Sequence, residues 1–280
     1  MSVDGSALHQ PKGGLLRRIV VIATALVAVL AIAVSAYAAT GDFNTYTAKL
    51  TFVPNKAGSS KSPAPIAFTE HYVAGGTAGN RTAPLTDIKT TIYGVRSNAK
   101  SFPTCSKSKI ANAKSDSGCP IGALIATGSI TAIVGPTNDQ AIGAPGTASC
   151  NPILHAWNGG PGKVVFFFVD KLPSHGCYNG LITTGTVGPF VGKVTVSGKN
   201  LIMDTPIPPS VSFPVSGLEG SLTSQTLHFL PLTKKVNGKT VAFNQSIGCK
   251  SGKRTYSVAF TANLNGQSQT DNVSASQKCG

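Results

Sequence analysis

Alternating apolar and polar positions are the main pattern after the first forty residues. In the segment 123–134, Ala123, Ile125 and Thr127 alternate with Leu124, Ala126 and Gly128, and the alternation continues to Val134. One face of this segment is mostly apolar and the other is mixed, which is typical of a half-buried β-strand. We therefore predict a strand here, with a bulge at Gly128.

The same pattern predicts short strands along most of the chain. The predicted strands are 46–53, 66–73, 88–95, 124–134, 164–169, 181–187, 191–196, 201–204, 222–230, 240–243, 255–264 and 269–273. The turn signals Ser197-Gly198, Asn237-Gly238 and Asn265-Gly266 fall between them, and the last predicts a hairpin. The most apolar of these segments, KVVFFFV, follows a Gly-rich turn and is expected to be a central strand that is buried on both faces.

Many short strands and few helix-forming residues predict an all-β fold, either a β-sandwich or a jelly roll. Residues 39–280 are long enough for one large sandwich or two small ones. The Pro-rich stretch at 206–214 fits either a boundary between two domains or a rigid connection inside one.

The first 38 residues are predicted to be a signal peptide. Leu15-Leu16-Arg17-Arg18 precedes an apolar run, and Ala36-Tyr37-Ala38 supplies the small residues of a cleavage site. The alternative is an uncleaved membrane anchor at 19–39, since this stretch is about as long as a bilayer-spanning helix. Either alternative places the rest of the chain outside the cytoplasm, as a secreted protein or a membrane-tethered ectodomain.

The segment from Phe102 to Ile130 joins a polar loop between two cysteines to the start of a strand. It reads FPTC at 102–105 and CPIGALIATGSI at 119–130. This segment resembles uncharacterised secreted β proteins of actinobacteria, which have a PTC...CPxG...GTG segment and a C-terminal cysteine pair. The similarity continues more weakly through 156–159 and 249–279. It implies a secreted β protein and supplies no activity.

Six cysteines in an exported chain predict three disulfides, and counting alone leaves fifteen connectivities open. Closeness in sequence favours the pairs Cys105–Cys119, Cys150–Cys177 and Cys249–Cys279, and the family resemblance supports the first and last of these. Cys150, His155, His175 and Cys177 also have the composition of a zinc site, but their spacing is not that of a known zinc finger. We therefore predict no metal and no cofactor.

The charge of the exported part suggests a class of partner. Without the first 38 residues, 21 Lys and Arg stand against 9 Asp and Glu, a formal charge of +12. A basic exported surface would bind anionic envelope polymers or glycans in a salt-dependent way, although scattered lysines also serve solubility. Lys250, Lys253 and Arg254 form one local cluster and are candidate binding residues. We expect no nucleic-acid partner, because no nucleic-acid-binding module is visible.

Catalytic motifs are scarce. The sequence contains no G-x-S-x-G, H-E-x-x-H, Walker or dinucleotide-binding motif. An envelope hydrolase with a dispersed site at Glu70, His71, Asp170 and His175 is the alternative to a binding protein. Adjacent residues on a strand point to opposite faces, so Glu70 and His71 are not expected to form a dyad.

Two aromatic residues are candidate contacts for a glycan or a partner. Trp157 precedes the Gly-rich turn, and Tyr178 follows Cys177 in a loop-like context. For Trp157 the alternative is packing in the core. Together these features predict a non-enzymatic protein that is secreted or associated with the cell envelope.

Overall fold

The computed structural model describes residues 39–40, 43–169 and 187–280. These residues form an all-β fold, a nearly closed barrel-like sandwich that carries disulfides, as the sequence predicts. No helix within the described part of the chain is both long and apolar enough to cross a bilayer. The predicted signal peptide at 1–38 lies outside the described residues.

The strands are connected mainly by tight turns. They are β1 (Ala39–Thr40), β2 (Asn44–Val53), β3 (Ala64–Pro65), β4 (Ala67–Gly76), β5 (Leu85–Tyr93), β6 (Val95–Ser97), β7 (Leu124–Pro136), β8 (Ala148–Cys150), β9 (Ile153–Asn158), β10 (Lys163–Val169), β11 (Phe190–Ser197), β12 (Asn200–Pro206), β13 (Leu218–Phe229), β14 (Thr233–Val236), β15 (Lys239–Ala242), β16 (Asn244–Ser246), β17 (Lys253–Leu264) and β18 (Gln267–Lys278). The helices are short: η1 (Ala99–Ser101), α2 (Lys107–Ala113), η2 (Ile121–Ala123) and α3 (Pro209–Ser212).

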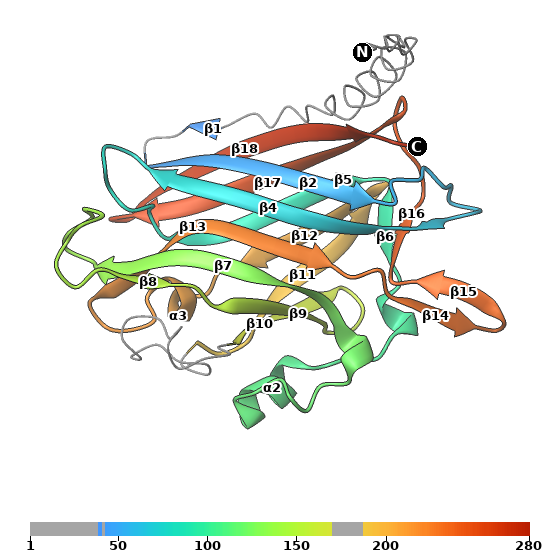
Figure 1. Ribbon diagram of the computed structural model, residues 1–280, viewed down its shortest axis with the longest axis horizontal. Coiled ribbons are helices and arrows are strands. Elements are labelled where there is room, and N and C mark those ends of the chain that lie inside the picture. Colours follow the sequence, from blue (N-terminus) through green and yellow to red (C-terminus); the bar gives the residue numbers. More distant parts are fainter. Residues whose placement is uncertain (1–38, 41–42, 170–186) are drawn as a thin grey trace, which may run out of the picture. The chain divides into compact units, whose positions relative to one another are not determined.

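One large antiparallel sheet forms the wall of the barrel. Its strand order is β1-β2-β4-β13-β7-β9-β10-β11-β12-β5-β17-β18, and β8 adds to β7 (Figure 1). The strands before and after the Pro-rich stretch 206–214 belong to this same sheet: β12 pairs with β5, and β13 pairs with β4 and β7. The stretch is therefore a connection inside one domain. The described residues of this fold belong to a single compact unit.

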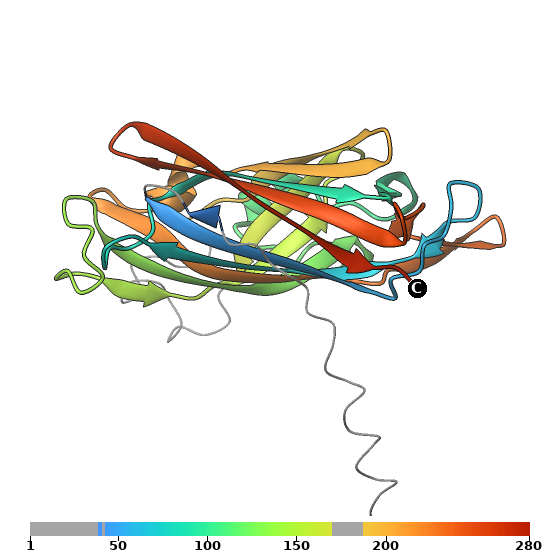
Figure 2. The same ribbon diagram turned by 90° about the horizontal axis from the view of Figure 1, so that it is seen from above.

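The two edges of this sheet meet through glutamine side chains of β18. Gln277 accepts a hydrogen bond from the backbone N–H of Phe52 at 2.8 Å and donates one to the Phe52 carbonyl at 3.3 Å. Gln269 accepts from the backbone N–H of Phe43 at 2.7 Å. Figure 2 shows β18, in red, crossing the blue strand β2. These side-chain amides bond backbone groups that a neighbouring strand would otherwise pair with. The edge of β2 is therefore partly covered by β18.

Strand alternation accounts for the core of the barrel. On β17, Tyr256, Val258, Phe260 and Ala262 point inward and are at most 3% exposed. Phe260 stacks on Tyr46 of β2, with ring centroids 4.5 Å apart, so strands next to the two edges of the sheet are in contact through the interior.

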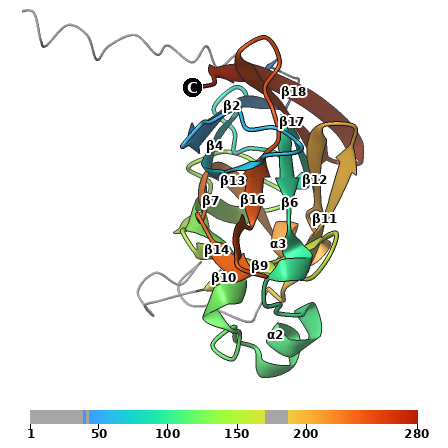
Figure 3. The same cartoon turned by 90° about the vertical axis from the view of Figure 1, so that its right-hand side faces the viewer.

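The segment KVVFFFV is buried on both faces, as predicted, because it has a partner on each side of the sheet. Val164 and Phe166 belong to the core inside the barrel. Val165 and Phe167 pack outside it against Ile110 of α2. Figure 3 shows α2 beyond β9 and β10. A short helix on a cysteine-bounded loop therefore covers the outer face of this part of the sheet.

Most predicted strands are confirmed, and so are three predicted turns. The hairpins β11–β12, β14–β15 and β17–β18 turn at Gly198, at Asn237-Gly238 and at Asn265-Gly266, where these residues have positive φ angles. The predicted strand at 181–187 lies outside the described residues except for Val187.

Three local predictions differ from the structure. The loop between Cys105 and Cys119 contains α2, whose N-terminus is capped by Ser106 and whose Ile110 is buried. Strands β9 and β14 were not predicted, and neither were the short strands β1, β3, β6, β8 and β16. β7 has no bulge at Gly128; its irregularity against β9 lies between Leu124 and Ala126. Gly128 instead permits close approach of β13, because a Cβ there would lie 1.8 Å from the Thr226 carbonyl oxygen.

Candidate functional site

Two predicted disulfides are confirmed. Cys105 is bonded to Cys119 and Cys249 to Cys279, with Cα atoms 5.5 Å and 6.6 Å apart. Cys150 is also disulfide-bonded, but its predicted partner Cys177 lies outside the described residues. A sulfur in a disulfide is not free to bind zinc, so Cys150 is not a ligand and the alternative four-residue zinc site is wrong. Two of its other residues, His175 and Cys177, lie outside the described residues. Disulfides of this kind indicate an oxidising compartment.

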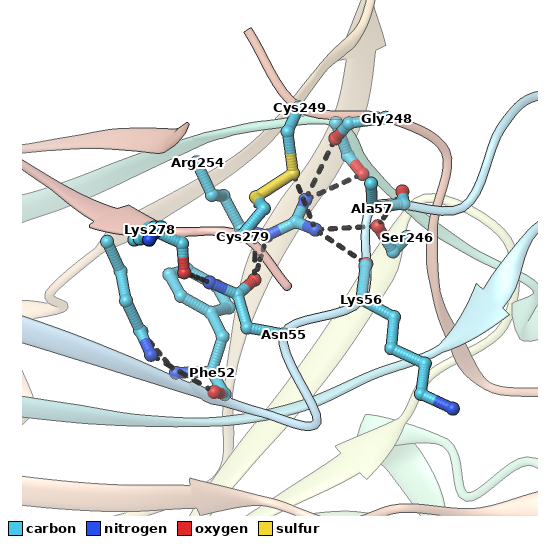
Figure 4. Close-up of a disulfide and its surroundings, with 12 residues drawn as sticks. Phe52, Asn55, Lys56, Ala57, Ser246, Gly248, Cys249, Arg254, Lys278 and Cys279 are labelled. Atoms are coloured by element: carbon cyan, nitrogen blue, oxygen red, sulfur yellow. Dashed lines mark hydrogen bonds between the residues drawn. A yellow bond between two sulfur atoms is a disulfide. The ribbon is translucent and has the colours of Figure 1, made fainter. Parts of the chain in front are cut away.

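Arg254 is not part of a binding surface, which corrects the sequence-based prediction. Its side chain is completely buried, and it lies at one end of the barrel beside the Cys249–Cys279 disulfide (Figure 4). The neighbouring Lys250 and Lys253 are exposed, as expected for a basic surface. Inward and outward positions alternate on β17, and Arg254 falls in register with the inward-facing Tyr256.

The guanidinium of Arg254 donates hydrogen bonds to several separate segments. These bonds run to Asn55 Oδ1 (2.9 Å), Lys56 O (3.3 Å), Tyr93 O (3.0 Å), Gly94 O (2.9 Å), Ser246 Oγ (2.6 Å), Gly248 O (3.3 Å) and Cys249 Sγ (3.5 Å). Phe52 lies under the cation, 5.4 Å from ring centroid to Cζ. Burial lowers the pKa of Arg254 to about 10, so it stays charged at neutral pH. Arg254 therefore links the segments 55–56, 93–94 and 246–249 at this end of the barrel by hydrogen bonds.

Trp157 is also structural. It is 5% exposed, and its Nε1–H donates to Asp116 Oδ2 at 3.1 Å. The same oxygen lies 2.7 Å from His155 Nδ1. Partial burial alone would raise the pKa of the Asp116 carboxyl, but the contacts with His155 and Trp157 hold that pKa below its ordinary value. Asp116 thus joins the cysteine-bounded loop to β9. The other aromatic candidate, Tyr178, lies outside the described residues.

The clearest candidate for a binding site is a cavity inside the barrel. Its volume is about 150 Å³. The described residues that line it are Glu70, Tyr72, Leu85, Ile88, Thr90, Ile130, Ala132, Val134, Cys150, Pro152, Leu154, Phe166, Phe168, Val169, Val187, Phe190, Met203, Thr205, Ile207, Val211, Ser212, Pro214, Gly220, Leu222, Gln225 and Leu227. Most of these side chains are apolar, and they come from strands on opposite sides of the barrel.

The strand registers give the direction of the cavity. Along β13 it runs from Leu227, which pairs with Glu70 of β4, past Gln225 to Gly220. Gly220 lies against α3, where a Cβ would be 3.2 Å from the Val211 carbonyl oxygen. The cavity therefore has a single carboxyl group near one end and a short helix at the other.

Glu70 faces the cavity, and His71 is on the exposed outer face of the sheet, as strand alternation predicts. His71 is paired there with Thr226, 2.9 Å from Nδ1 to Oγ1. The two residues do not converge on one site. The other residues of the predicted dispersed hydrolase site, Asp170 and His175, lie outside the described residues.

Burial dominates the chemistry of Glu70. The residue is 1% exposed, and this desolvation raises the pKa of its carboxyl to about 8, against a weaker opposing effect of a hydrogen bond with Tyr72. From the sequence, either a catalytic group or a half-exposed strand residue is expected at Glu70, and the half-exposed position is wrong because the side chain is buried. The signal for a buried role was present, because Glu70 occupies the face of β4 that otherwise carries Phe68, Tyr72 and Ala74.

Comparison of the chain with models of protein families, with curated proteins and with solved structures found no match. Among residues 43–169 and 187–280, no cluster of His, Cys, Asp and Glu side chains could hold a metal ion.

Proposed function

We propose that this protein binds a small apolar molecule inside its barrel. The single observation that carries the proposal is the cavity of about 150 Å³ inside the barrel. Protein interiors are packed to the density of organic crystals and contain few voids larger than a water molecule. A void of this size lined mainly by apolar side chains therefore marks a place where the core is built around a space.

The size of the cavity indicates the size of the ligand. An engineered cavity of about 150 Å³ lined by apolar side chains stays dry and binds benzene. Small closed barrels of other proteins use their interior in the same way to hold one small ligand. A ligand of about one aromatic ring, or a short alkyl chain, would fill the space beside Leu222, Phe166 and Ile130. Burial of its apolar surface would supply the affinity.

Toluene is the probe for this proposal. We expect the disulfide-bonded protein to bind toluene with a raised melting temperature and with shifts of the methyl resonances of cavity residues. The Ala132→Phe variant should lose this binding, because the added ring would occupy the cavity that Ala132 lines. The matched control is Ala113→Phe on the exposed face of α2, which should bind as the wild type does. Equal binding by all three proteins, or no binding by the wild type, would contradict the proposal.

We also propose that the protein is secreted through its N-terminal signal segment and that its outer surface contacts anionic envelope polymers. Exposed lysines support this second function, since Lys107, Lys109, Lys234, Lys235 and Lys250 all lie on the surface. Their attraction to phosphate or carboxylate polymers would be screened by salt.

The test of the surface function is retention on isolated envelope fractions across a range of salt concentrations. We expect retention at low ionic strength and release as the salt is raised towards 1 M, where the screening length falls to about 3 Å. Retention that is unchanged by salt, or absent at every salt concentration, would reject a charge-driven surface. The toluene measurement is independent of this outcome.

A further inference from the structure

The carboxyl group at one end of the cavity has an unused acceptor. Glu70 Oε1 is buried and has no hydrogen-bond partner among the described residues. A buried polar atom without a partner is costly, and most such atoms in proteins are paired. Glu70 lines both the large cavity and a second, smaller one of about 30 Å³. Its side chain therefore faces open space on the inside of the barrel.

Tyr72 offers the Glu70 carboxyl one neutral hydrogen bond, but no described residue that lines the cavities offers a cation to pair with its carboxylate form. Its cross-strand neighbours are Leu50 on β2 and Leu227 on β13. From its own strand, Tyr72 faces the same side, and the Tyr72 hydroxyl is 2.9 Å from Thr90 Oγ1 of β5. Among the described residues lining either cavity there is no Lys, Arg or His, and Glu70 is the only acidic residue.

We propose that the ligand of the barrel is a small apolar primary amine, whose ammonium group pairs with the Glu70 carboxylate while its apolar group lies along β13 towards α3. This inference rests on the proposed function of the cavity. An ammonium group carries the charge that the barrel lacks and donates up to three hydrogen bonds. It could therefore reach Glu70 Oε1 and the neighbouring oxygens of Thr90 and Gln225, which line the same cavity.

An amine fits this site better than the other simple functional groups. A carboxylate would lose its hydration in this apolar interior, and no Lys, Arg or His among the described lining residues would pair with it. An alcohol can donate a hydrogen bond, but it brings no charge, and charge-assisted hydrogen bonds are about twice as strong as neutral ones. A hydrocarbon would fill the cavity and leave Oε1 unpaired.

Binding of an ammonium ion also predicts a proton balance. The pKa of about 8 means that Glu70 is mostly protonated at pH 7 in the free protein. An ammonium ion stabilises the carboxylate, so each amine bound releases nearly one proton from Glu70 to the buffer. The other titratable group lining the cavity beside Glu70 is Tyr72, whose pKa burial raises well above 10, so it stays neutral in this range.

The experiment compares four ligands of similar size: benzylamine, benzyl alcohol, toluene and benzoate. Binding is measured by calorimetry at pH 7 for the wild type and for Glu70→Gln, which keeps the shape of the side chain and removes its charge. We expect the wild type to bind benzylamine at least tenfold more tightly than toluene or benzyl alcohol, and benzoate most weakly. Glu70→Gln should lose this preference and still bind toluene.

The outcomes separate this inference from the proposed function. If toluene binds and benzylamine binds no better, the cavity is a site for neutral apolar molecules and the inference is overturned. If a benzylamine preference persists in Glu70→Gln, Glu70 is not the recognising group and the inference also fails. If no ligand binds, the proposed function itself fails. In the wild type, benzylamine affinity should rise about tenfold per pH unit from pH 6 to pH 7, with proton release detected from the buffer dependence of the binding heat.

Discussion

Replacing Arg254 by methionine is expected to lower the free energy of unfolding by about 3–5 kcal/mol, because several buried acceptors lose their donor and each such loss costs about 1–3 kcal/mol. Methionine keeps much of the length and the apolar stem of arginine. It cannot donate to the carbonyl oxygens of Lys56, Tyr93, Gly94 and Gly248, which would remain beside the disulfide without their donor. The measurement is urea unfolding of the oxidised protein, followed by tryptophan fluorescence.

Lys253→Met is the matched control for this prediction. Lys253 precedes Arg254 on β17, carries the same charge and is exposed, so its loss should change the stability by at most about 0.5 kcal/mol. Arg254→Lys should also be destabilising, because a single ammonium cannot reach the segments that the guanidinium fork joins. Similar unfolding midpoints for Arg254→Met and Lys253→Met would show that the network does not stabilise the barrel.

Glu70 is expected to make the stability of the free protein fall as the pH rises from about 4.5 to 8. The pKa of Glu70 is raised from its ordinary value of 4.5 to about 8, because burial disfavours the carboxylate. Below pH 4.5 Glu70 is protonated in both the folded and the unfolded chain, so its contribution to the free energy of unfolding is fully present. Between these values the unfolded chain loses the proton while the folded chain keeps it, so unfolding becomes easier. Above about pH 8 both states are ionised and the loss is complete.

The loss due to Glu70 is on the order of 4–5 kcal/mol across this interval, since each pH unit corresponds to about 1.4 kcal/mol. The test is the difference in unfolding free energy between Glu70→Gln and the wild type, measured from pH 4 to pH 9. Other titrating groups are common to both proteins and cancel in this difference. The difference should grow with pH in favour of Glu70→Gln and then level off. Parallel stability curves would mean that the carboxyl is not desolvated.

The two predictions concern polar groups that the alternation of the strands turns inward. Arg254 is satisfied by neutral acceptors and joins segments at the end of the barrel, so its role is structural. Glu70 Oε1 has no partner among the described residues and faces a cavity, so its role is assigned to binding. Both are buried, and the difference between them lies in whether the protein itself supplies their hydrogen bonds.

The strands and turns were largely predictable because their signals are local. Alternation of side chains over five to ten residues identified β2, β7 and β17, and the turn residues Asn265-Gly266 located the last hairpin. The two confirmed disulfides join cysteines that are close in sequence, 14 and 30 residues apart. Helix α2 was missed because its single buried residue, Ile110, leaves no helical periodicity to detect.

The sequence by itself determined the all-β class, most of the strands and which faces of them are apolar, since these depend on neighbouring residues only. The tertiary structure decided what those faces meet. Arg254 and Trp157 are residue types that often contact ligands at a protein surface. The segments that bury them here come from distant parts of the chain. The cavity beside Glu70 is likewise made by strands that the sequence does not place side by side, because pairing between distant strands has no local signal.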